Sequence, residues 1–162
     1  MSTLVLWRSP TAEGAERASR SLADLAGRER GLVHDVALVS WPRGRGKLIT
    51  RPLPELASDQ ALGEGFWRVL FGLVFYSPLL GAAVVSGDAT SSGSFAEVGI
   101  DDTFVNRVRD TITPGTSGLF VLGADALVEQ LRDLPGAGPP VRLLVTRLSP
   151  RQESTLREVF VG

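Results

Sequence analysis

Residues 66–85 read FWRVLFGLVFYSPLLGAAVV, and Arg68 is the one charged residue among them. An apolar segment of about 18 or more residues is long enough to span a bilayer. Ser77 and Pro78 interrupt this one, and a proline inside a helix costs about 3 kcal/mol because it removes a backbone hydrogen bond. The stretch therefore predicts a broken, Gly-rich helical insertion whose apolar surface has to be covered on every side.

The sequence on both sides of this stretch alternates between strand and helix patterns. Strands are predicted over residues 3–8, 32–41, 47–53, 118–122 and 141–148, and helices over 11–28, 101–112, 125–134 and 150–161. Such an order is typical of an α+β fold of ferredoxin-like type, which has an antiparallel sheet with helices on one side. The apolar insertion or a second subunit must then cover the other side.

Local signals mark where several of these elements begin and end. PRGRG, residues 42–46, lies between two strand patterns and predicts a hairpin. Ser9 followed by Pro10 predicts the start of the first helix, and Ser149, Pro150 and Gln152 predict a capping box at the start of the last one. We expect one domain over residues 1–162, in which residues 56–95 form the apolar helical insertion and a flexible polar linker.

Composition restricts the classes of function. The chain has 17 basic and 18 acidic side chains, so no overall positive field favours nucleic acid. It has no cysteine, which removes disulfides and thiolate chemistry and is compatible with a reducing compartment. The first ten residues, MSTLVLWRSP, lack the pattern of a signal peptide. We expect a cytoplasmic protein, with membrane association as an alternative.

Three polar groups are candidates for sites of chemistry. His34 beside Asp35 could orient a general base, but no nucleophile motif accompanies the pair. Asp101 and Asp102 supply fewer oxygen ligands than a metal ion needs, and helix capping explains them. The basic residues of the hairpin, Arg43, Arg45, Lys47 and Arg51, are typical of a solvated turn. The sequence predicts no catalytic residue, no cofactor and no metal site.

Three passages carry a resemblance to a known family: ALGEGFWRVLFGLVFYSPLLGAA (61–83), FAEVGIDDTFVNRVRDTITPGTSGLFVL (95–122) and VRLLVTRLSPRQESTLREVF (141–160). Together they resemble a bacterial family known as domain of unknown function 1269, whose members are often labelled as predicted membrane proteins. The most specific passage is the second, with its Gly-Ile-Asp-Asp helix start and its Pro-Gly turn into a strand. The resemblance implies no activity, cofactor or catalytic residue.

The function predicted from the sequence is non-enzymatic self-assembly through the apolar insertion. If the aromatic side chains of the insertion were exposed, they would form an apolar patch larger than those that monomeric proteins normally show. The predicted interface consists of Phe66, Trp67, Leu70, Phe71, Val74, Phe75, Tyr76, Leu79 and Leu80. Three alternatives stay open: burial of the segment inside a monomer, insertion of residues 66–85 into a bilayer, and a small-molecule-binding or enzymatic domain that uses the sheet face.

Overall fold

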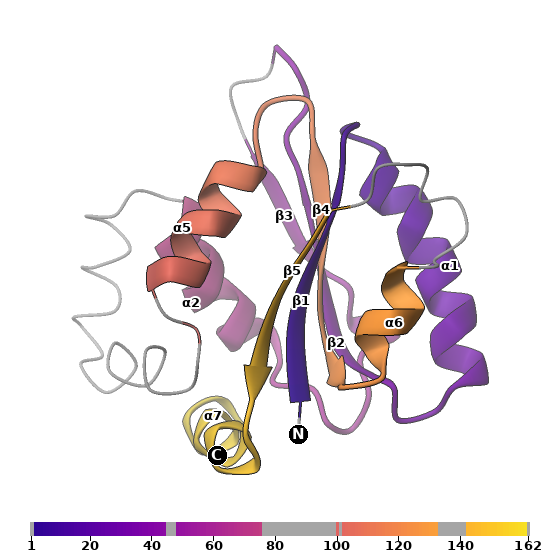
Figure 1. Ribbon diagram of the computed structural model, residues 1–162, viewed down its shortest axis with the longest axis vertical. Coiled ribbons are helices and arrows are strands. Elements are labelled where there is room, and N and C mark those ends of the chain that lie inside the picture. Colours follow the sequence, from indigo (N-terminus) through magenta and orange to yellow (C-terminus); the bar gives the residue numbers. More distant parts are fainter. Residues whose placement is uncertain (1, 45–47, 76–99, 101, 133–141, 162) are drawn as a thin grey trace.

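The computed structural model describes residues 2–44, 48–75, 100, 102–132 and 142–161 (Figure 1). In these residues one antiparallel sheet has the strand order β3-β2-β4-β1-β5. The strands are β1 (Ser2–Ser9), β2 (Val33–Ser40), β3 (Ile49–Pro52), β4 (Ser117–Ala124) and β5 (Arg142–Leu148). β2 and β3 pair as the predicted hairpin.

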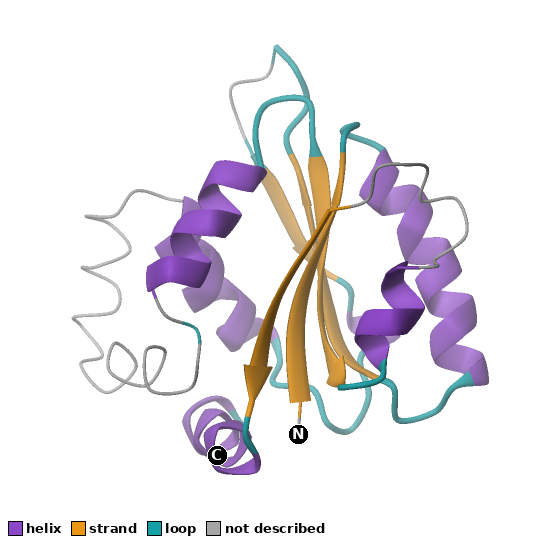
Figure 2. Cartoon of the chain, viewed as in Figure 1, coloured by secondary structure: helices purple, strands orange, loops and turns teal. Residues whose placement is uncertain are grey.

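Helices cover both faces of the sheet (Figure 2). One layer consists of α1 (Gly14–Arg28) and α6 (Leu127–Arg132). The other layer consists of α2 (Glu64–Phe75), α5 (Asp102–Thr111) and α7 (Pro150–Phe160). A short 3-10 turn, η1 (Pro54–Leu56), connects β3 to the segment before α2.

The α+β prediction is confirmed. The order β1-α1-β2-β4-α6-β5 along the chain, with β1 and β4 at the centre of the sheet, is the ferredoxin-like arrangement. β3 extends the sheet by one edge strand, and the chain between β3 and β4 supplies α2 and α5. The sequence left open what covers the second face of the sheet; α2, α5 and α7 of the same chain do so.

The central strands have apolar residues on both faces because a helical layer lies against each face. In β2, Val36 and Leu38 point to the α1 and α6 layer, whereas Ala37 and Val39 point to the other layer. All four side chains are buried. The alternation of side chains along β2 therefore separates two hydrophobic cores on opposite faces of the sheet.

Gly123 in β4 shows how closely the chain packs at the end of the sheet. A Cβ atom at this position would overlap the backbone carbonyl of Leu32, and it would lie 2.8 Å from Cδ2 of Leu127. The amide of the next residue, Ala124, donates a hydrogen bond to the same carbonyl at 2.9 Å. Glycine is needed here because two backbone segments approach each other directly.

The structure confirms one of the two predicted helix starts and contradicts the other. The capping box of α7 is confirmed, with Ser149 Oγ accepting from the Gln152 amide at 3.2 Å and Gln152 Oε1 accepting from the Ser149 amide at 2.8 Å. The start predicted at Ser9 is wrong, because Ser9 is the last residue of β1 and α1 begins at Gly14. Ser117 of β4 supplies the acceptor for this helix, since its Oγ accepts from the Ala15 amide at 2.9 Å.

Candidate functional site

The predicted interface segment begins in α2, and the inward side of this helix belongs to the core of the chain itself. Five of the nine predicted interface residues are buried there, with exposed fractions of 0% for Phe66, 0% for Trp67, 0% for Leu70, 3% for Phe71 and 1% for Val74. Phe75 is half-buried against the same cluster. Tyr76, Leu79 and Leu80 lie outside the described residues.

Aromatic rings hold this inward side of α2 on the sheet. The ring of Phe71 lies 5.1 Å from that of Phe120 in β4, in an edge-to-face arrangement, and 5.7 Å from that of Trp67, on which it stacks. Phe66 meets Phe160 of α7 at 5.5 Å. For these residues the structure therefore shows burial inside one chain.

The opposite side of α2 is formed by Gly65, Arg68, Val69 and Gly72, which we call the outer stripe. These residues follow the i, i+3, i+4, i+7 spacing of one helix face. Gly65 and Arg68 are exposed, and Val69 and Gly72 are half-buried. Apart from the backbone of its own helix, no described atom lies within 4 Å of a Cβ built on Gly72. The outer stripe thus has a notch at Gly72 that no described side chain fills, whereas Val69 packs in part against the core of its own chain and a Cβ on Gly65 would lie 3.9 Å from the ring of Phe160.

Two charged side chains, Arg109 and Asp35, hold α2 in place, in roles that the sequence did not predict. Arg109 of α5 donates from Nε to the Val74 carbonyl at 2.9 Å and from Nη2 to the Leu73 carbonyl at 3.1 Å. Arg109 thereby ties the last described turn of α2 to α5. Among the described residues no helix is both long and apolar enough to cross a bilayer.

The N-terminal end of α2 depends on Asp35. Its Oδ2 accepts from the amides of Leu62 and Gly63 at 3.2 and 3.0 Å, and its Oδ1 accepts from the Val36 amide at 3.0 Å. The residue is 3% exposed, and these three amides satisfy its carboxylate. An acidic residue inside an apolar strand pattern was the sequence signal for this anchor.

His34 does not form the pair with Asp35 that the sequence suggested. Its Nδ1 is buried and has no hydrogen-bond partner among the described residues, and both carboxylate oxygens of Asp35 are bound by backbone amides. Burial lowers the pKa of His34 from 6.5, against the opposing effects of Glu153 and a backbone hydrogen bond with Gly31. Burial therefore favours the neutral imidazole.

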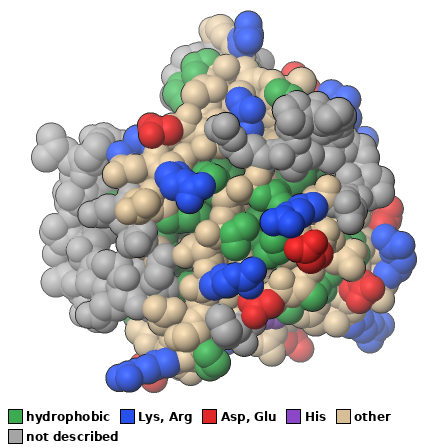
Figure 3. Space-filling model, viewed as in Figure 1, with side chains coloured by type: hydrophobic (Ala, Val, Ile, Leu, Met, Phe, Trp, Pro, Cys, Tyr) green, Lys and Arg blue, Asp and Glu red, His purple; other side chains and the backbone are tan. Residues whose placement is uncertain are grey.

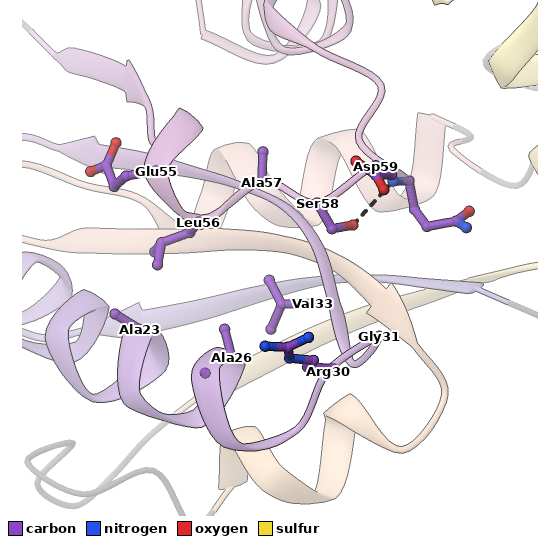
Figure 4. A pocket seen from close by; sticks show the side chains of 12 residues that line it. Ala23, Ala26, Arg30, Gly31, Val33, Glu55, Leu56, Ala57, Ser58 and Asp59 are labelled. Carbon is purple, nitrogen blue, oxygen red and sulfur yellow. Dashed lines mark hydrogen bonds between the residues drawn. The ribbon is translucent and has the colours of Figure 1, made fainter.

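A groove of about 630 Å³ separates the C-terminal half of α1 from the loop after η1 (Figure 4). Its lining residues are small, apolar or charged: Ala23, Ala26, Gly27, Arg30, Gly31, Val33, Glu55, Leu56, Ala57, Ser58, Asp59 and Gln60. In this view Glu55 and Asp59 lie at opposite ends of one side of the groove, and Arg30 lies on the other side, below them. The groove can hold a small molecule or a partner's side chain, but its charged groups do not converge on one point.

The other polar candidates do not form a site within the described residues. Arg43 and Arg51 of the hairpin are exposed, and Arg45 and Lys47 lie outside the described part of the chain. Asp101 also lies outside it. Where the structure is described, no three His, Asp or Glu side chains gather as metal ligands would.

Comparison with known proteins gives a match to the model of a protein family. The model of a family described as a protein of unknown function, DUF1269, matches residues 61–161 and confirms the resemblance seen in the sequence. No curated protein and no solved structure matches the chain.

Proposed function

Because the chain belongs to the DUF1269 family, whose function is unknown, its role must be argued from its own geometry, and we propose that it is a non-enzymatic domain that assembles with copies of itself. The outer stripe of α2 is the proposed contact. The contact predicted from the sequence used the side of α2 that is buried in the core; the proposed contact uses the opposite side of the same helix. The notch at Gly72 is the observation that carries the proposal.

Glycine inside a helix needs a reason, because it destabilises the helix by about 1 kcal/mol relative to alanine. At Gly123 of β4 the reason for a glycine lies within the chain, where a Cβ would overlap the Leu32 carbonyl. At Gly72 no described atom outside the helix backbone comes within 4 Å, so packing inside the described part of the chain does not require the glycine. A second backbone that approaches this face closely would require it.

The shape of the outer stripe suits a copy of the same helix. Gly65 and Gly72 are two turns apart on one face, with Val69 between them and Arg68 beside them. A two-fold axis across α2 would bring Val69 of one copy toward the glycines of the other, and a symmetric dimer needs only this one self-complementary patch. The arginine would lie at the rim, where water can solvate it.

The non-enzymatic part of the proposal rests on what the candidate catalytic groups do. Asp35 uses its oxygens to hold the backbone before α2. His34 is buried at the start of β2, and its charged form is disfavoured. Both residues therefore serve the fold rather than present a reactive group at a surface.

Size-exclusion chromatography with light scattering on detergent-free protein tests the assembly. The wild-type chain is expected to exceed the 17.3 kDa of one copy. Gly72→Leu fills the notch and is expected to lower the mass, while far-UV circular dichroism stays unchanged because nothing described is near the new side chain. A folded Gly72→Leu protein with the wild-type mass would refute the proposed contact.

Gly27→Leu is the matched control. Gly27 also lies inside a helix, α1, and a Cβ added there would also meet no described atom within 4 Å apart from the helix backbone. Because Gly27 is the last residue but one of α1, a glycine there costs the helix less than in its interior and needs no second backbone to explain it, so this variant is expected to keep the wild-type mass. A loss of mass in Gly27→Leu alone would instead place the contact in the groove beside α1.

We propose that this assembly forms in the cytoplasm. The alternative is that it forms at a bilayer. The apolar sequence of residues 66–85 motivates the latter. Cell fractionation without detergent distinguishes them. Recovery of the protein in the membrane pellet, and its release only by detergent, would contradict the cytoplasmic proposal.

A further inference from the structure

The groove between α1 and the loop after η1 takes no part in the proposed assembly. That contact uses α2, which belongs to the helical layer on the other face of the sheet. The volume of the groove, about 630 Å³, lies within the range of about 300–1,000 Å³ that is typical of small-molecule sites. A ligand bound in the groove therefore leaves the outer stripe free.

The rest of the chain holds both walls of the groove in place. In the loop wall, the Ser58 amide donates to the His34 carbonyl at 2.9 Å, and Arg157 of α7 donates to the Gln60 carbonyl at 2.6 Å. The other wall is α1, which is anchored by Leu22 in the core below it. Because both walls are already ordered, a ligand does not lose affinity by having to order them.

The floor of the groove is apolar and has room for an aliphatic chain. α1 contributes Ala23, Ala26 and Gly27, and apart from the helix backbone no described atom lies within 4 Å of a Cβ built on Gly27. Leu56 lies across the groove from Ala23, and Val33 lies between the two walls (Figure 4). Methylene groups of a ligand gain free energy when such a surface removes them from water.

Three charged side chains around this floor are available to a ligand. Glu55, Asp59 and Arg30 are exposed, and within the described part of the chain none of them forms an ion pair or a side-chain hydrogen bond. Elsewhere on the surface, for example on the face shown in Figure 3, basic and acidic side chains lie next to one another, and α6 and β5 each contribute to an ion pair.

The positions of these charges favour an elongated ligand over a compact ion. Glu55 and Asp59 lie at opposite ends of one side of the groove, and Arg30 lies on the other side. A metal ion or a phosphate needs several groups that converge on one point, which the groove does not offer. A chain with a charged group at each end matches separated charges of this kind.

We propose that the groove binds a small diamino carboxylic acid, in which an unbranched aliphatic chain separates one amine from a second amine and a carboxylate. The terminal amine pairs with Glu55, the α-amine pairs with Asp59, and the carboxylate pairs with Arg30. This direction follows from the start of β2, because Arg30 precedes the turn into that strand and Ser58, beside Asp59, is hydrogen-bonded to it. The inference does not depend on the proposed self-association.

The charge pattern of the groove distinguishes this class of ligand from simpler ones. A linear diamine leaves Arg30 without a partner and brings a like charge near it. An amino acid with an apolar side chain leaves Glu55 unpaired. A diamino acid within a peptide has lost the charge of its carboxylate, so Arg30 again has no anion to bind.

Saturation-transfer NMR titrations test the proposal, with lysine as the probe. The comparison ligands each lack one charged group: norleucine lacks the terminal amine, 6-aminohexanoic acid lacks the α-amine, and 1,5-diaminopentane lacks the carboxylate. We expect lysine to bind about two- to fivefold more tightly than each of them, since an ion pair at an exposed site contributes little.

Three variants assign the charges one by one. Glu55→Gln is expected to remove the preference for lysine over norleucine, Asp59→Asn the preference over 6-aminohexanoic acid, and Arg30→Met the preference over 1,5-diaminopentane. Each variant is expected to keep the other two preferences, because the three side chains do not contact one another. Equal affinity of the wild-type protein for all four ligands would overturn the proposal.

Gly27→Leu and Gly72→Leu form a matched pair that separates this inference from the proposed function. Gly27→Leu places a side chain in the groove and is expected to lose lysine binding while it keeps the wild-type mass. Gly72→Leu is expected to lose mass and keep lysine binding. A folded Gly27→Leu protein that binds lysine as the wild type does would overturn the groove as the site, whereas an unchanged mass in Gly72→Leu would overturn only the α2 contact.

Discussion

Phe71→Ala separates a core residue from an interface residue. The side chain is 3% exposed, and its ring contacts those of Trp67, Phe75 and Phe120 at 5.7, 5.8 and 5.1 Å. Truncating a buried phenylalanine to alanine costs about 3–5 kcal/mol, and each lost ring pair contributes about 0.5–1.5 kcal/mol beyond area burial. We therefore expect the free energy of unfolding to fall by about 4 kcal/mol.

Urea unfolding followed by far-UV circular dichroism measures this loss, with light scattering on the same samples. Val69→Ala is the comparison, since Val69 is half-buried on the outer stripe and its truncation should cost about 1 kcal/mol or less in the unfolding of one chain. If Phe71→Ala lowers the mass of the assembly but changes the unfolding free energy by less than about 1 kcal/mol, the reasoning from burial is wrong.

Further predictions concern polar groups. Because burial lowers the pKa of His34, its neutral form stabilises the fold above pH 6.5, and this stability decreases as the pH falls below 6.5; His34→Gln should flatten the decrease in urea unfolding measured from pH 8 to 5. Asp35→Asn turns an acceptor of three backbone amides into a group with its own donors, and should cost about 1–3 kcal/mol in the same assay. Arg109→Met should accelerate amide exchange in the last described turn of α2 but not in α1, and equal acceleration in both helices would contradict its role in holding α2. Ser149→Ala should cost about 1 kcal/mol, whereas Thr155→Ala, on an exposed turn of the same helix, should cost less than half of that.

The order of strands and helices was predictable because it depends on local periodicity. The alternating residues of β2 and the capping box at Ser149 are examples, since both concern side chains within a few positions of each other. The start of α1 was not predictable. Ser9 has the right local pattern, yet Ser117, 102 residues away from Ala15 in the chain, caps the helix.

For the candidate site, too, the sequence predicted the local features and the tertiary structure decided the contacts. Hydrophobic content identified α2 as a helix that has to be buried, but it could not say which side is covered by the chain itself. The aromatic contacts with Phe120 and Phe160 decide that, and they join residues far apart in the sequence. The anchor at Asp35 and the hydrogen bonds from Arg109 to α2 also require tertiary contacts.

The sequence by itself determined the α+β class, the apolar insertion near residues 66–85 and the family, because these depend on composition and on short-range patterns. Only the tertiary structure decided that α2, together with α5 and α7, closes the second face of its own sheet, and that β3 and β5 are the outermost of the described strands. The physical reason is that coverage of a surface depends on which distant segments meet. The periodicity of apolar residues predicts which face of an element is buried, but it does not predict which segment buries that face.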